Sequence, residues 1–274
     1  MIERSEAGST GTGAPAPEHG DAKRAGRARQ IVATWLGRVP YLAGWRLQEA
    51  VATRVRGGGP DRLLLLEHDP VYTIGRRGST ANLIAPASEL RAHGASVYRV
   101  DRGGDITYHG PGQLVGYPIV SLGEAPDLVA YVRALEDALI ATLASYGVAG
   151  RREHRKTGVW VDLAPGRPAK IAAIGVRVSR GVSTHGFALN VSTDLAAFER
   201  MIPCGFAHEV ASLERLGVTA TVAEVGERAA GALADRLARE LRWDAVLAPV
   251  RDDEVPQEAP VREAEDALAE ALAS

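Results

Sequence analysis

The sequence has one cysteine, Cys204, among its 274 residues. A single thiol excludes an internal disulfide, which agrees with a reducing compartment. The chain also has no surplus of charge: 32 basic and 34 acidic residues leave a formal net charge of -2. Neither nucleic acid nor an anionic membrane surface is therefore the expected main partner.

Long hydrophobic runs are missing too. No stretch approaches the roughly 18 consecutive apolar residues of a membrane helix, and the first residues lack the apolar core of a secretory signal. Hydrophobic residues nevertheless make up 46% of the chain, enough for one well-formed core. We therefore expect a globular protein of enzyme size in the cytoplasm.

The two ends differ in composition from the middle. Residues 1–27 are rich in Gly, Ala, Pro, Ser and charge, with few bulky apolar side chains to offset the entropy of ordering. They are predicted to be a disordered tail. Residues 251–274 are acidic and Ala-rich, and their last dozen residues have only a weak helical pattern. We expect an appendage there, and a folded domain over residues 28–250.

Patterns within this domain alternate between helix and strand. Helical spacing begins near Leu47 and ends at the glycines 57–59, a second helix follows Asp127, and a third follows Thr221, which forms a capping box with Glu224. Short apolar runs predict strands at 63–68, 71–75, 97–100, 114–120 and 158–161. Residues 171–178 and 185–191 are predicted to form a hairpin across residues 179–181. The order predicts an α+β fold with a mixed, largely antiparallel sheet and packed helices.

Residues 102–113, RGGDITYHGPGQ, concentrate glycine between two predicted strands. Glycine lets a backbone approach a ligand closely and point N–H groups at it. A glycine pair alone more often marks a tight surface loop, and the Gly-Lys-Ser/Thr of a phosphate-binding loop is missing. Arg102, Tyr108 and His109 in the same loop favour a binding role.

Cys204 lies between Pro203 and Gly205. A lone cysteine commonly packs as a small buried hydrophobe, but this bend suits presentation of a side chain better than core packing. Residues 192–194 can cap a short helix through residues 198–202. Cys204 would then follow the C-terminal end of that helix, where the dipole disfavours a thiolate. A nucleophile at this position therefore needs a cation nearby.

Lys170 is the candidate for that cation. Most lysines are solvated, but small apolar residues, IAAIG, follow this one, so its ammonium can be partly desolvated. An adjacent lysine lowers the pKa of a thiol from about 8.5 towards neutrality. Once neutral, the amine can act as a base.

His109 and His185 offer two other arrangements with Cys204. One is a cysteine–histidine pair of the protease type, and the other is a metal site. Neither is well supported, because the residues are isolated from one another rather than closely spaced, and no orienting amide or carboxylate stands out.

Several segments resemble the lipoyl(octanoyl) transferases, a family that passes an octanoyl group from acyl carrier protein to a lysine of lipoyl domains. In the order of the family, the segments are LLLLEHDPVYTIGRRG, RGGDITYHGPGQLVGYPI, KTGVWV, KIAAIGVRVSRGVSTHGFALNV and MIPCG. The resemblance spans roughly residues 63–217, and neither tail is covered.

The resemblance implies a role for specific residues. It implies that Cys204 is the nucleophile that forms an acyl thioester and that Lys170 activates it. It also implies an acyl-binding site at residues Arg102, Gly103, Gly104, Asp105, Ile106, Thr107, Tyr108, His109, Ala173, Ile174, Gly175, Gly186, Phe187 and Ala188. The implied fold is that of the biotin and lipoate protein ligases, with residues 28–250 as the octanoyltransferase catalytic domain.

The implied reaction is the first step of protein lipoylation, with neither ATP nor a metal as cofactor. Its expected partners are acyl carrier protein, the lipoyl domains of 2-oxoacid dehydrogenase complexes and the glycine cleavage H protein, and we expect a monomer. Two alternatives stay open. One is an ATP-dependent lipoate or biotin ligase on the same fold, which needs no cysteine, and the other is a non-catalytic acyl-binding module.

Overall fold

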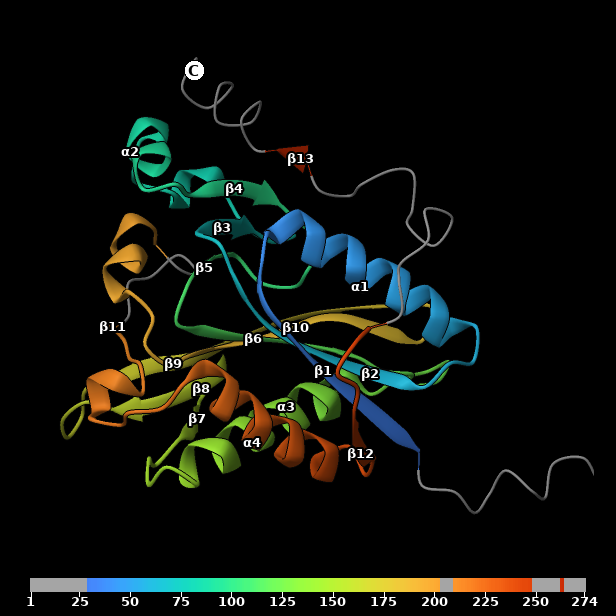
Figure 1. Ribbon diagram of the computed structural model, residues 1–274. Coiled ribbons are helices and arrows are strands. Elements are labelled where there is room, and N and C mark those ends of the chain that lie inside the picture. Colours follow the sequence, from blue (N-terminus) through green and yellow to red (C-terminus); the bar gives the residue numbers. More distant parts are fainter. Residues whose placement is uncertain (1–28, 203–208, 248–261, 264–274) are drawn as a thin grey trace, which may run out of the picture.

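The computed structural model describes residues 29–202, 209–247 and 262–263, and Figure 1 shows their arrangement. Nine strands form the main sheet, in the order β12-β1-β2-β6-β10-β9-β8-β7, with β11 paired to β9. These strands are β1 (Gln30–Val39), β2 (Asp61–His68), β6 (Gln113–Ile119), β7 (Arg151–Glu153), β8 (Lys156–Asp162), β9 (Pro168–Ser179), β10 (Val182–Asn190), β11 (Glu209–Val210) and β12 (Glu240–Trp243).

A smaller sheet has the order β13-β4-β3-β5. It consists of β3 (Val71–Ile74), β4 (Ser96–Arg99), β5 (Ile106–His109) and β13 (Arg262–Glu263). In the main sheet, β1 is parallel to β2 and β12, and β11 is parallel to β9, whereas the other neighbours are antiparallel. The predicted α+β fold with a mixed, largely antiparallel sheet is confirmed.

Helices cover both faces of the main sheet. The helices are α1 (Tyr41–Arg56), α2 (Ala87–Ala92), α3 (Leu128–Ala144) and α4 (Val222–Arg236), with short 3-10 helices η1 (Thr80–Asn82), η2 (Leu195–Arg200) and η4 (Glu214–Leu216). Figure 1 shows α3 and α4 side by side on one face and α1 on the other. A large apolar core lies between the sheet and α3 and α4, and a smaller one lies under α1.

One end of each of the three long helices agrees with the sequence. Helix α1 ends at Arg56, directly before the predicted glycines, but it begins at Tyr41, six residues before Leu47. The carboxylate of Asp127 caps α3 by accepting a hydrogen bond from the N–H of Ala130, and Thr221 and Glu224 form the predicted capping box of α4.

Three local predictions were incomplete or wrong. Residues 106–109 are a strand within the segment predicted to be a loop, because they pair with β3 in register. Strand β1, near the N-terminal tail, was not predicted. The short helix ends at Arg200 instead of residue 202, and the side chain of Asp194 caps it.

The predicted tails lie almost entirely outside the described residues, so their order or disorder stays a prediction. Of the C-terminal segment, residues 262–263 are described, and they pair with β4. None of the helices in the described ranges is long and apolar enough to cross a membrane.

Candidate active site

A cavity of about 540 Å³ lies between the two sheets. This volume falls in the range of about 300–1,000 Å³ that is typical of small-molecule sites. The β9–β10 hairpin supplies one wall, and the segment from Arg102 to His109 supplies another. Nearly all the predicted site residues that the structure describes line it: Arg102, Gly103, Gly104, Asp105, Ile106, Thr107, His109, Lys170, Ala173, Ile174, Gly175, Gly186, Phe187 and Ala188.

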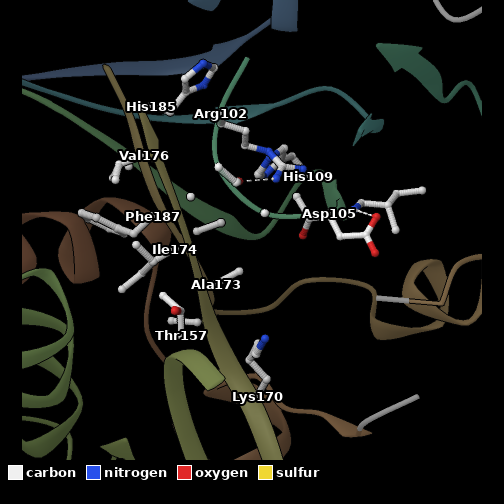
Figure 2. A pocket seen from close by; sticks show the side chains of 18 of the residues that line it. Arg102, Asp105, His109, Thr157, Lys170, Ala173, Ile174, Val176, His185 and Phe187 are labelled. Carbon is white, nitrogen blue, oxygen red and sulfur yellow. Dashed lines mark hydrogen bonds between the residues drawn. The ribbon is translucent and has the colours of Figure 1, made fainter. Parts of the chain in front are cut away.

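The hairpin brings two of the predicted segments directly together. Residues 173–175 of β9 pair with residues 186–188 of β10 in antiparallel register. The turn between them has two residues with positive φ, Arg180 and Gly181, as the right-handed twist of a tight hairpin requires. Figure 2 shows Lys170 towards one end of this wall and His185 towards the other, with Ala173 and Ile174 between them.

Two glycines permit the close packing around the hairpin. A Cβ at Gly175 would lie 2.8 Å from the carbonyl oxygen of Gly103, whose N–H donates to the carbonyl of Val176. A Cβ at Gly186 would collide with the carbonyl of Gly116 on the next strand. Glycine at 175 therefore lets the two walls of the cavity approach each other, and glycine at 186 lets β10 lie close to β6.

Arg102 fixes the glycine-rich segment to the smaller sheet. Its guanidinium donates hydrogen bonds to the carbonyl and hydroxyl of Thr73, at 2.6 and 2.9 Å, and to its neighbouring carbonyl at Gly103. The side chain is 7% exposed. These bonds hold a buried cation at the cavity wall and keep the segment against β9.

Lys170 is half-buried at the cavity wall. In the sheet it lies across from Trp160 of β8 on one side and Val210 of β11 on the other. Its Nζ is 4.8 Å from the centroid of the Trp160 ring, and the Nζ of Lys156 is 5.0 Å from the same ring. An indole face attracts ammonium groups, so Trp160 holds both lysines near the cavity.

His109 is held neutral. Burial, and secondarily the nearby His68, lower the pKa of His109 to about 3. Its Nδ1 is 2.8 Å from the Oε1 of Gln113. Because the amide oxygen can only accept, Nδ1 carries the proton and Nε2 is an acceptor. A histidine with so low a pKa is poorly matched to general-base work near neutral pH.

His185 belongs to a different network. Its Nε2 is 2.8 Å from Oδ1 of Asp101, and the other carboxylate oxygen of Asp101 pairs with Arg177 at 2.9 Å. The ring is therefore tied to a charged cluster beside α1, although it also lines the cavity. Within the part of the chain that is described, no group of three or more potential ligand side chains is placed to hold a metal ion.

Among the predicted site residues that the structure describes, Tyr108 alone does not line this cavity. Its side chain points to the other face of β5 from those of Thr107 and His109, and it lines a second cavity of about 470 Å³ together with Tyr72. The ring of Tyr108 also packs edge-on against Phe198, which lines the first cavity. Cys204 lies outside the described residues, so its role stays a prediction. Met201 and Val210, each one residue removed from an end of the undescribed segment 203–208, both line the first cavity.

Comparison with known proteins decides the family. Residues 40–234 match the family model of the lipoyl protein ligase A/B catalytic domain. An octanoyltransferase of Solibacter usitatus is 51% identical over 70% of this chain and 86% of its own length. An octanoyltransferase of Mycolicibacterium gilvum is also 51% identical, over 74% of this chain and 84% of its own. The chain belongs to the octanoyltransferase family. It is an acyltransferase.

Solved structures confirm the fold of this octanoyltransferase family member. A Thermoplasma acidophilum protein with bound lipoic acid superposes with a TM-score of 0.67 at 18% identity, over 89% of this chain and 94% of that one. A lipoate-protein ligase A bound with ATP superposes with a TM-score of 0.64 at 20% identity, again over 89% of this chain and 94% of that one. At such identities the likeness shows the catalytic fold alone.

Sequence reasoning missed part of the octanoyltransferase cavity. Further polar or aromatic side chains line it, and four of them are Tyr41, Tyr117, Trp160 and Asn190. They come from four different elements, and only strand register reveals that Trp160 lies beside Lys170. The motif KTGVWV contains Trp160, which was the one signal in the sequence that pointed towards it.

Proposed function

We propose that this protein transfers an octanoyl or lipoyl group from acyl carrier protein to the acceptor lysine of lipoyl domains, through a thioester on Cys204. The observation that carries the proposal is a cavity with Lys170 towards one end and the small and apolar residues 173–176 along its wall. The roughly 50% identity to octanoyltransferases supports octanoyl as the group that is transferred.

The chain on either side of Cys204 supports its role as the nucleophile. Met201 precedes it by three residues and lines the cavity, and three residues of chain span at most about 11 Å. Val210 follows it, pairs with Lys170 in the sheet and also lines the cavity. A cysteine in this segment is therefore tethered at one end beside the smaller sheet, where Met201 bridges Leu83, and at the other end to the wall that holds Lys170.

The first step loads the enzyme. Lys170 takes the proton of the Cys204 thiol, and the thiolate attacks the thioester carbonyl of the donor. The new carbon–sulfur bond to Cys204 forms, the bond to the carrier sulfur breaks, and the departing carrier thiolate takes the proton back from Lys170. One thioester replaces another, so the step is close to isoenergetic and needs neither ATP nor a metal.

The second step transfers the acyl group to the acceptor. The amine of the acceptor lysine attacks the Cys204 thioester and gives up a proton to the now neutral Lys170. The bond to Cys204 breaks, the amide forms, and the thiolate and the Lys170 ammonium are restored together. The acyl chain lies along residues 173–176 and beside residues 187–188, where burial contributes about 0.8 kcal/mol per methylene.

The test is transfer from octanoyl-acyl carrier protein to an unmodified lipoyl domain, with ATP omitted. We expect octanoyl-lipoyl domain as product, in several turnovers and without added metal. A requirement for ATP would instead indicate a ligase, and acyl binding without transfer would indicate a binding module. A chelator-treated sample checks the metal independence.

A further inference from the structure

The cavity of this nearly neutral protein is strongly cationic. The formal net charge of the chain is -2, yet five basic side chains and a single carboxylate, Asp105, are among the residues that line the cavity. The basic residues are Arg77, Arg102, Arg155, Lys156 and Lys170. Such a concentration of one sign favours an anionic ligand at this place.

Three of the five cations contact neighbouring groups of the cavity wall. Arg102 is bound to Thr73 and Gly103, and both lysines lie against the ring of Trp160. The other two, Arg77 and Arg155, are exposed, and we call them the cationic rim.

The cationic rim is supplied by both sheets. Arg77 belongs to the loop that follows β3 of the smaller sheet, and Arg155 lies in the turn between β7 and β8 of the main sheet. Their side chains make no hydrogen bond or ion pair with any other residue in the described ranges 29–202 and 209–247. Elsewhere many arginines do pair with carboxylates.

Carboxylates near the cationic rim are already engaged. The two oxygens of Asp105 accept hydrogen bonds from the side chain of Asn82, at 2.7 Å, and from the N–H of Ile106, at 2.8 Å. Glu153, two residues before Arg155, pairs with Arg151. Neither of these carboxylates pairs with Arg77 or Arg155, so both guanidinium groups can meet a ligand.

We propose that the cationic rim binds the phosphate group of the prosthetic arm that carries the acyl group. This proposal rests on the proposed function, because only a donor of that kind brings such an arm to the cavity. A phosphopantetheine arm is neutral between its thioester and its phosphate. When the thioester reaches into the cavity, the phosphate trails behind it, and guanidinium groups match its oxygens in charge and geometry.

Binding of two donor analogues tests the proposal. In both, an octanamide replaces the thioester, so neither can be consumed; one carries the terminal phosphate of phosphopantetheine, and the other is the pantetheine without phosphate. Calorimetry is done with the wild type, with Arg77→Gln and Arg155→Gln together, and with Arg236→Gln. Arg236 is an exposed arginine of α4 that lines neither cavity.

We expect the phosphate to tighten binding to the wild type and to Arg236→Gln by about tenfold, as two exposed charge pairs allow. This gain should vanish in the double variant and fall steeply with salt. Equal binding of the two analogues by the wild type, or an unchanged gain in the double variant, would overturn the proposal.

Transfer from intact octanoyl-acyl carrier protein, measured in parallel, separates this proposal from the proposed function. Loss of affinity for the carrier protein in the double variant, without any loss for the phosphate analogue, would assign the cationic rim to the acidic surface of the carrier and contradict the phosphate. Absence of transfer by the wild type would instead contradict the proposed function, and the binding data would still decide the ligand of the rim.

Discussion

At the scale of single residues, Lys170 stands out because its surroundings restrain a flexible cation. Its backbone is paired on both sides, and its ammonium lies 4.8 Å from the centre of an indole ring. Gly158 has a positive φ, and a Cβ there would lie 3.6 Å from the Cε of Lys170. Such restraint reduces the entropy lost when the ammonium meets a thiolate.

Replacing Lys170 with Met should lower the rate of octanoyl transfer by about 10²–10⁴-fold, the usual contribution of a positioned acid or base. The fold should persist, because the methionine keeps the apolar stem. Lys156→Met is the matched control, since Lys156 lies at a similar distance from the same ring. Transfer assays with both variants check the prediction, and equal losses would show that Lys170 has no special role.

Ala173 should set the length of the acyl chain that the cavity accepts. It lies between Lys170 and Ile174 on the cavity wall and pairs with Ala188 on β10. Ala173→Leu adds three carbons to this space, so we expect butanoyl to be favoured over octanoyl by at least about tenfold relative to the wild type. Competition between the two donors measures the ratio, and an unchanged ratio would place the chain elsewhere.

At the scale of elements, a buried aromatic cluster joins α1, both sheets and the cavity. The ring of Tyr41, on α1, lies 5.1 Å from that of His68 on β2 and 6.3 Å from that of His109 on β5. His68 is fully buried, donates through Nδ1 to the carbonyl of Val39 and accepts at Nε2 from the hydroxyl of Tyr117. Both imidazoles are therefore neutral parts of the core.

This cluster predicts how stability depends on pH. Burial lowers the pKa of His68 to about 4 and that of His109 to about 3, whereas both titrate near 6.5 in the unfolded chain. Below that value the unfolded state binds more protons. The contribution of the two neutral histidines to the free energy of unfolding is therefore complete above about pH 6.5. It is lost as the pH falls towards 4, by up to about 1.4 kcal/mol per pH unit for each histidine.

Urea unfolding between pH 7 and pH 4.5 measures this slope. In His68→Gln, the free energy of unfolding should be lower at pH 7 because a buried side chain is changed. Its slope against pH should be smaller by about the contribution of one histidine. An unchanged slope in the variant would mean that His68 does not titrate on unfolding.

The cap of α4 offers a change that should affect stability alone. The hydroxyl of Thr221 accepts from the N–H of Glu224, and the Glu224 carboxylate accepts from the N–H of Thr221. Thr221→Ala should lower the free energy of unfolding by about 1 kcal/mol. Because α4 packs on α3 and contributes nothing to the lining of the cavity, transfer activity per folded molecule should not change, and a loss would reveal coupling between this face and the site.

At the scale of the whole molecule, the sequence predicts those parts of the fold that local signals define. The capped helices and the β9–β10 hairpin follow from short patterns, such as Thr221 with Glu224 and the turn at Gly181. The division into two sheets does not, because β3, β4 and β5 are short and their partners are chosen by long-range contacts. Strand Ile106–His109 was hidden among glycines for the same reason.

The candidate site shows the same limit. The glycine-rich segment and the AIG and GFA segments could be singled out from composition and family resemblance, and the site residues predicted in them all line the cavity except Tyr108. Tyr108 differs because it lies on strand β5, where successive side chains point to opposite faces, whereas the sequence predicts a loop. Trp160 and Tyr41 were missed because their place in the site depends on register and packing.

The central claim is that Cys204 carries the acyl group in the cavity beside Lys170. Mass spectrometry of the protein after mixing with octanoyl-acyl carrier protein, followed by proteolysis, tests it most directly. We predict one octanoyl group on the peptide that contains Cys204, which is lost when an unmodified lipoyl domain is added and is absent from Cys204→Ala. Octanoyl on another residue, or undiminished loading of Cys204→Ala, would contradict the account.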